Sequence, residues 1–111
     1  MSLNIKTRTE QHAAIVSIAG EVDMYSSTQA RAAILEQIGK KVRQIVVDLD
    51  QVPYMDSSGV AVLIEGLKKC GEYGGTLSIT GLRDNVREVF ELTRLDKIFK
   101  IYENLEAALA E

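Results

Sequence analysis

The chain is 111 residues long, 46% of them hydrophobic, and its formal net charge is −3. A chain of this size buries roughly two-thirds of the surface that its unfolded form exposes, so we expect a single domain over residues 1–111. Acidic and basic residues are interspersed without a basic stripe, which argues against direct binding to nucleic acid. No run approaches the roughly 20 apolar residues of a transmembrane helix, and the N-terminus has no signal-peptide core. We therefore expect a cytoplasmic protein without membrane insertion.

The first elements are predicted to be two paired strands. Alternating side chains over residues 14–19 are typical of a strand, and a shorter strand over residues 3–7 pairs with it through a turn near Gln11 and His12. His12 is the only histidine in the chain, so there is no second histidine for a catalytic or metal-binding pair. We interpret it as a surface residue.

A helix and a central strand are predicted next. Ser26 and Gln29 form a capping-box pattern, and Gly39 ends the helix that follows. Residues 45–49 are nearly all apolar, which is typical of a strand buried on both faces of a sheet. Asp48 interrupts this run, and we interpret it as a structural residue with a local hydrogen-bond partner.

A carboxylate and two hydroxyls stand where this strand and its loop give way to an apolar helix. The segment is Asp56-Ser57-Ser58-Gly59, and an apolar stripe follows it at helical spacing, made of Val60, Leu63, Ile64, Leu67 and Cys70. The first turn of a helix has unpaired N–H groups and about half a positive charge, so it can hold a carboxylate or a phosphate. The simpler interpretation is that one of these polar residues only caps the helix. Cys70 is the only cysteine, which excludes an internal disulfide and a cysteine zinc site.

The remainder of the chain is predicted to add two strands and two helices. Residues 76–80 form a strand, Asp84 caps a helix, residues 98–102 form a last strand, and residues 103–110 form a closing helix. Strands that alternate with helices predict an α/β fold, with helices packed against a largely parallel sheet.

The predicted topology also places a binding surface. In open α/β sheets, binding sites gather at the carboxyl ends of the strands. If the strands that precede them are parallel, the loops at residues 21–25, 52–58 and 81–84 share one edge of the sheet. We predict that this edge is a surface for a partner.

Three segments together resemble a known family. They are Asp56-Ser57-Ser58-Gly59, Val46-Val47-Asp48-Leu49 before it, and Gly20-Glu21-Val22-Asp23 near the start. With these segments the chain resembles the STAS domain, and specifically the bacterial anti-sigma factor antagonists. The resemblance implies the STAS fold, a four- to five-stranded, mostly parallel mixed sheet packed against about four helices. The chain departs from the common Gly-Leu-Gly continuation of the motif, because Val60 and Ala61 follow Gly59.

The resemblance also implies a regulatory site. The serine directly after the aspartate is phosphorylated in the family, which corresponds to Ser57, while Ser58 belongs to the motif without being the acceptor. Asp23, Asp56, Ser57, Ser58 and Gly59 form the implied partner surface. The resemblance implies that the unphosphorylated protein binds an anti-sigma factor, itself a serine kinase of the histidine-kinase ATPase type, and so frees a sigma factor. Phosphorylation at Ser57 then prevents binding, and a phosphatase restores it. The chain is thus expected to be a phosphoprotein in transcription regulation, not an enzyme, with no cofactor and no metal.

Other functions are weighed against this one. A hydrolase would need a base beside Ser57 and a Gly-x-Ser-x-Gly turn, and the chain has no such turn. Residues 66–71 have the glycine spacing of a phosphate-binding loop but lack the lysine that follows it. A response-regulator receiver would need an acidic pair after the first strand. The alternative that stays open is a STAS adaptor subunit of a lipid-trafficking ABC transporter.

Overall fold

The computed structural model describes residues 2–111 of the chain. The described residues form five strands, four α-helices and one 3-10 helix, which are β1 (Asn4–Glu10), β2 (Ala13–Ala19), α1 (Ser27–Gly39), β3 (Gln44–Gln51), α2 (Ser57–Glu72), β4 (Thr76–Thr80), α3 (Asp84–Leu92), η1 (Leu95–Lys97), β5 (Lys100–Tyr102) and α4 (Leu105–Leu109). Strands and helices alternate after β2, as predicted.

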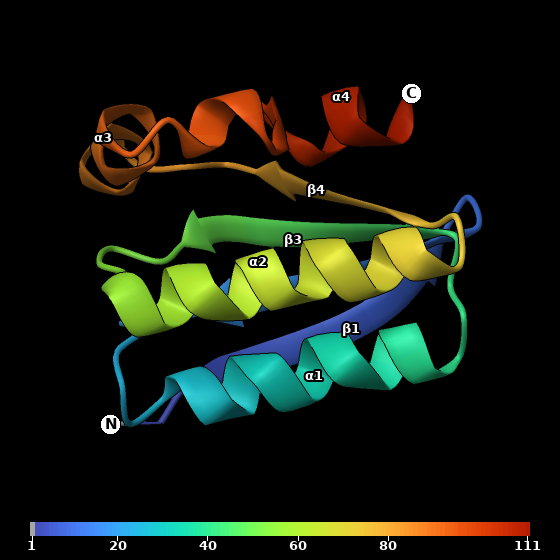
Figure 1. Cartoon of the computed structure of the whole chain (residues 1–111), viewed down its shortest axis with the longest axis horizontal. Helices are drawn as coiled ribbons and strands as arrows, with labels where there is room; N and C mark the ends of the chain where they lie inside the picture. The colour runs from blue at the N-terminus through green and yellow to red at the C-terminus, as the bar shows by residue number, and fades with distance from the viewer. Residues whose placement is uncertain (1) are drawn as a thin grey trace.

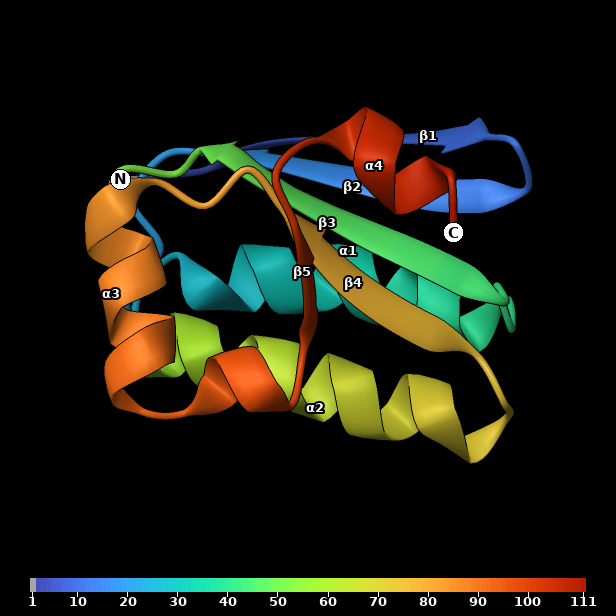
Figure 2. The same cartoon turned by 90° about the horizontal axis from the view of Figure 1, so that it is seen from above.

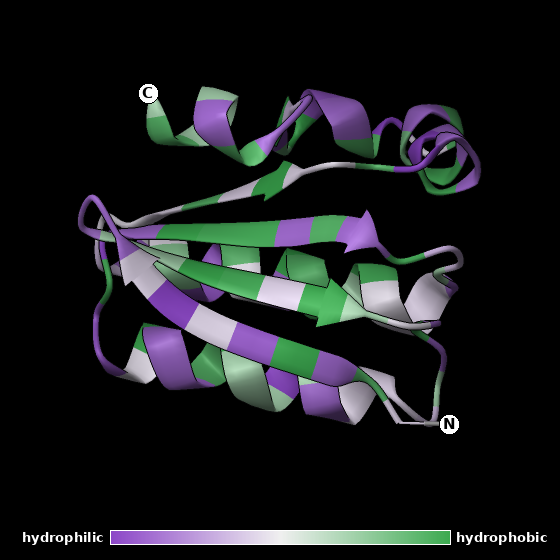
Figure 3. Cartoon of the chain, turned by 180° about the vertical axis from the view of Figure 1, so that it is seen from behind, coloured by the Kyte–Doolittle hydropathy of each residue, from purple (hydrophilic) through white to green (hydrophobic). Residues whose placement is uncertain are grey.

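The strands form one mixed sheet in the order β1-β2-β3-β4-β5. β1 runs antiparallel to β2, and the pairs β2–β3, β3–β4 and β4–β5 are parallel. β1 lies at the edge of the sheet and carries mostly hydrophilic side chains (Figure 3). The predicted α/β fold with a mostly parallel mixed sheet is therefore confirmed.

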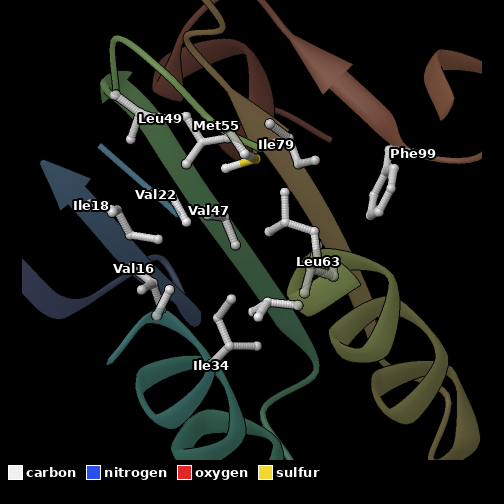
Figure 4. Packing of buried hydrophobic residues seen from close by; sticks show 14 of the residues in the cluster. Val16, Ile18, Val22, Ile34, Val47, Leu49, Met55, Leu63, Ile79 and Phe99 are labelled. Carbon is white, nitrogen blue, oxygen red and sulfur yellow. The ribbon is translucent and has the colours of Figure 1, made fainter. Parts of the chain in front are cut away.

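Helices pack on both faces of the sheet. α1 and α2 lie side by side along one face (Figure 1), and α4 lies on the opposite face (Figure 2). The large core cluster fills the space between the sheet and the first three helices (Figure 4), and a small cluster of Ala13, Ile15, Val46 and Ala108 lies under α4.

The central strand matches its predicted character. Val46 and Val47 point to opposite faces of β3, and both side chains are fully buried. Asp48 is half-buried, and its Oδ1 accepts a hydrogen bond of 3.1 Å from the backbone N–H of Asp50. This is the local partner that we predicted.

Neither predicted helix cap makes its side-chain bond, although Ser26 does occupy the N-cap position of α1. Ser26 precedes α1, but its side chain makes no capping bond, and its hydroxyl donates instead to the backbone oxygen of Glu21 at 2.8 Å. The side chain of Gln29 accepts from the backbone N–H of Leu3 at 2.7 Å, so it does not close a capping box. At α3 the cap position belongs to Arg83, and Asp84 is the first helical residue. For Gln29, a contact to a distant segment replaces the local bond that the pattern predicts.

The ends of several elements also differ from the prediction. β1 extends to Glu10, because it pairs with β2 through seven residues although its own apolar pattern is weak. The last strand starts only at Lys100, after the η1 turn, and the closing helix starts at Leu105 with Asn104 as its cap. The buried face of α2 includes Val62, which the predicted stripe omits, because α2 packs against both α1 and the sheet.

Candidate functional site at the carboxyl edge of the sheet

Three loops meet at the carboxyl edge of the parallel strands. The β2–α1 loop joins the β3–α2 loop through a parallel bridge between Val22 and Met55. Two backbone bonds extend this bridge, from Val22 N–H to the Tyr54 oxygen at 3.0 Å and from Asp56 N–H to the Val22 oxygen at 3.1 Å. The β4–α3 loop contacts the end of β3 at the same edge, where the Arg83 side chain donates to the Asp50 oxygen at 3.0 Å. The shared edge that we predicted is therefore present.

Asp56 is the N-cap of α2. Its backbone is extended, and its Oδ1 accepts a hydrogen bond of 2.9 Å from the backbone N–H of Ser58. The hydroxyl of Ser58 donates to the same oxygen. The Ser58 hydroxyl and the first backbone amides of the helix lower the pKa of the Asp56 carboxyl below its ordinary value. Asp56 therefore stays ionised and fixes the first turn of α2.

The two serines of the motif have different surroundings. Ser57 is the first residue of α2 and is exposed to solvent, and its hydroxyl makes no hydrogen bond within residues 2–111. Ser58 is half-buried, and its hydroxyl is engaged by Asp56. Of these two hydroxyls, only that of Ser57 is free to approach another molecule.

Gly59 lets the start of α2 approach the bridge between the two loops. A Cβ atom at Gly59 would lie 2.6 Å from Cγ of Met55 and 2.8 Å from Cγ1 of Val22, distances that a real side chain does not tolerate. Met55 and Val22 are both buried in the core, where Figure 4 shows them close together. The glycine of the motif is therefore required for close packing.

Asp23 is turned inward, toward its own loop. Its Oδ1 accepts hydrogen bonds from the backbone N–H groups of Tyr25 and Ser26, each at 2.9 Å, and lies 3.2 Å from the Ser26 hydroxyl. The Ser26 oxygen accepts in turn from the Asp23 N–H at 3.0 Å. The Ser26 amide is the main reason that the pKa of Asp23 lies below its ordinary value. Asp23 thus fixes the shape of the β2–α1 loop.

Several residues of this edge were not singled out from the sequence, although some lie in the loops predicted to form it. Ser26 is 1% exposed and completes the hydrogen bonds of the loop, and the spacing Asp-x-x-Ser, which is typical of a side chain–backbone turn, could have indicated it. Met24, Tyr25 and Tyr54 are exposed apolar side chains on the same loops. No periodic pattern marks loop residues of this kind.

The described part of the chain offers no metal site. Within residues 2–111, no group of three or more His, Cys, Asp or Glu side chains is arranged to hold an ion. In the same residues, no helix combines the length and the apolar character that crossing a membrane requires.

Comparison with known proteins identifies the family. The sequence matches the family model of the STAS domain over residues 4–108. The chain belongs to the STAS family. The anti-sigma-B factor antagonist of Staphylococcus aureus (strain NCTC 8325 / PS 47) is 31% identical over 106 residues, which cover 96% of this chain and 98% of that protein. The anti-sigma F factor antagonist of Paenibacillus polymyxa is 30% identical over 112 residues, covering 100% of this chain and 96% of the relative.

A solved structure shares the fold of this STAS chain. The crystal structure of an anti-sigma factor antagonist from Mycobacterium paratuberculosis superposes with a TM-score of 0.90. It is 27% identical in sequence, and the match covers 97% of this chain and 92% of that one. The resemblance to the bacterial anti-sigma factor antagonists is therefore confirmed.

Proposed function

We propose that this STAS protein is an anti-sigma factor antagonist that is switched off by phosphorylation of Ser57. The observation that carries the proposal is the contrast between the two serines. The Ser57 hydroxyl is exposed and unbonded at the start of α2, and the Ser58 hydroxyl is held by Asp56. Relatives that match nearly the whole chain are named as anti-sigma factor antagonists, which supports the same function.

In this mechanism the unphosphorylated protein binds an anti-sigma factor with its carboxyl edge and so releases a sigma factor. The anti-sigma factor is a serine kinase of the histidine-kinase ATPase type, and it transfers phosphate from ATP to Ser57. A separate phosphatase removes the phosphate and restores binding. The chain acts as a single cytoplasmic domain over residues 1–111, without a cofactor or catalytic residue of its own.

The electrostatics of the edge explain why the phosphate changes binding rather than folding. A phosphoryl group adds about −1.5 to −2 charges. At the first turn of α2 it lies at the positive end of the helix, so the fold accommodates it. It also lies beside the carboxylates of Asp56 and Asp23, which repel each other. A partner that covers this edge must strip water from three neighbouring anionic groups, which opposes binding.

Two serine variants test the assignment. Ser57→Ala removes the exposed hydroxyl and should abolish phosphate incorporation by the purified kinase from the same genome, with binding to that kinase retained. Ser58→Ala is the matched control, and it should still accept phosphate on Ser57, as shown by peptide mapping of residues 51–65 after incubation with ATP. Loss of incorporation in Ser58→Ala alone would show that the assignment is wrong by one residue.

The lipid-transport adaptor is distinguished by the protein purified from its native cells. Intact-mass spectrometry that finds a phosphate on Ser57 supports the switch. An unmodified protein that co-purifies with transporter subunits supports the adaptor, since such a subunit needs no serine kinase. The nearly full-length match to named antagonists favours the switch.

A further inference from the structure

Three large apolar side chains stand in solvent around the Ser57 site. Met24 is 67% exposed, Tyr25 is 79% exposed and Tyr54 is 47% exposed. They come from the two loops that the Val22–Met55 bridge joins, and we call them the edge patch. Methionine and tyrosine are enriched at protein interfaces, where they provide apolar contact area.

The loop that carries Met24 and Tyr25 is held in one conformation. Asp23 and Ser26 bond to each other and to the backbone on both sides of these two residues. The Tyr25 N–H itself donates to Asp23 at 2.9 Å. The loop is therefore ordered although its two central side chains make no contribution to the core. An ordered loop loses little conformational entropy on binding, so its exposed side chains are preorganised for a contact.

We propose that the edge patch is the apolar anchor that inserts into an apolar socket on the anti-sigma factor. This inference rests on the proposed function and adds the residues that hold the partner. The contacts connect the patch to the switch, because Asp56, directly before Ser57, donates its N–H to the oxygen of Val22 at 3.1 Å. Tyr54 lies two residues before Asp56 on the same loop. A partner that binds the patch is therefore placed next to the start of α2, where Ser57 lies.

The charge around the patch decides between possible occupants. Glu21, Asp23 and Asp56 lie on the same two loops as the patch, and all three are acidic. A second copy docked through a twofold axis would bring the same carboxylates face to face, and an anionic membrane would meet them with like charge. Both arrangements are repelled, whereas a different protein with an apolar socket is not.

The anchor also explains how one phosphate can end the contact. A phosphoryl group on Ser57 keeps a large hydration shell, and the socket that receives the edge patch must exclude water to gain the apolar contact. The phosphate needs water at the position from which the socket must exclude it. Phosphorylation then weakens binding without any change in the conformation of the edge.

Three substitutions test the anchor with the full chain and the purified kinase from the same genome. Met24→Ala and Tyr25→Ala should each weaken the affinity, measured by calorimetry, by about tenfold or more, as expected for interface anchors. Tyr25→Phe keeps the ring and should retain the affinity to within about threefold. Leu92→Ala is the matched control, since Leu92 is 77% exposed near the end of α3 and lies outside the patch. Its affinity should equal that of the wild type.

The outcomes separate the anchor from the switch. One outcome overturns the anchor and leaves the proposed function standing. In that outcome the wild type binds, Ser57→Asp binds more weakly, and the patch variants bind with the affinity of the wild type. Absence of wild-type binding overturns both. Patch-dependent dimers in sedimentation, or patch-dependent binding to vesicles with anionic lipid, would overturn the anchor in favour of a second copy or a membrane. Thermal unfolding of Met24→Ala and Tyr25→Ala should match the wild type, which shows that lost affinity is not lost folding.

Discussion

Replacing Gly59 with alanine would place a methyl group where the start of α2 meets the loop bridge. That methyl would lie 2.6 Å from Met55 Cγ and 2.8 Å from Val22 Cγ1, and both neighbours are buried and cannot move away freely. Overpacking of this kind costs about 1–3 kcal/mol. The same change gains at most about 1 kcal/mol from the higher helix propensity of alanine. We therefore expect Gly59→Ala to lower the free energy of unfolding.

A second glycine of the same helix isolates the contact. Gly71 also lies in α2, and a Cβ atom there would meet nothing within 4 Å. Gly71→Ala should raise the free energy of unfolding by up to about 1 kcal/mol through propensity alone. When the unfolding free energies of the two variants are subtracted, the propensity gain largely cancels. The remaining difference of about 1–3 kcal/mol measures the close approach of the Gly59 position to Met55 and Val22.

The assay is urea denaturation of the wild type and the glycine variants under identical conditions, with the midpoint and the slope fitted together. Gly66→Ala should fall between the other two, because a Cβ there would lie 3.0 Å from Ile34 Cγ2 and from Leu77 Cδ1. Equal unfolding free energies for Gly59→Ala and Gly71→Ala would refute the reasoning that close approach explains the glycine of the motif.

Three further predictions follow from the structure. Arg31, whose Nε lies 2.7 Å from Glu65 Oε1, and to a smaller extent Lys69 lower the pKa of Glu65 from 4.5 to about 2. The difference in unfolding free energy between the wild type and Glu65→Gln should therefore be full above pH 4.5 and should shrink as the pH falls toward 2. A difference that does not change with pH would contradict this. Phe90→Ala should cost about 3–5 kcal/mol in urea unfolding, because Phe90 is fully buried, whereas Leu92→Ala should change little. The buried Cys70 thiol should react with a thiol reagent only after unfolding, and rapid labelling of the native protein would contradict its position in the core.

Much of the fold could be predicted from the sequence because the hydrophobic period is local. The β3 run and the β4 strand are clear in the sequence, and the position of the Asp56–Gly59 motif at the start of α2 follows from the apolar residues around it. The predicted caps at Ser26 and Asp84 failed because the Ser26 hydroxyl donates within its own loop to Glu21, and because α3 begins at Asp84 itself with Arg83 at the cap position. A capping pattern in sequence also does not include distant competitors such as Leu3, whose N–H donates to the side chain of Gln29.

The sequence by itself determined the α/β class, the order of strands and helices, the family and the segment that carries the motif, because each depends on residue type and short-range spacing. The three-dimensional structure showed which serine hydroxyl is free, since Asp56 engages Ser58 two residues on and leaves Ser57 in solvent. It also turned Asp23 inward and left Met24 and Tyr25 exposed beside the motif. The position of these two side chains beside the motif depends on how the two loops pair through Val22 and Met55, a contact between residues far apart in the chain that no local pattern encodes.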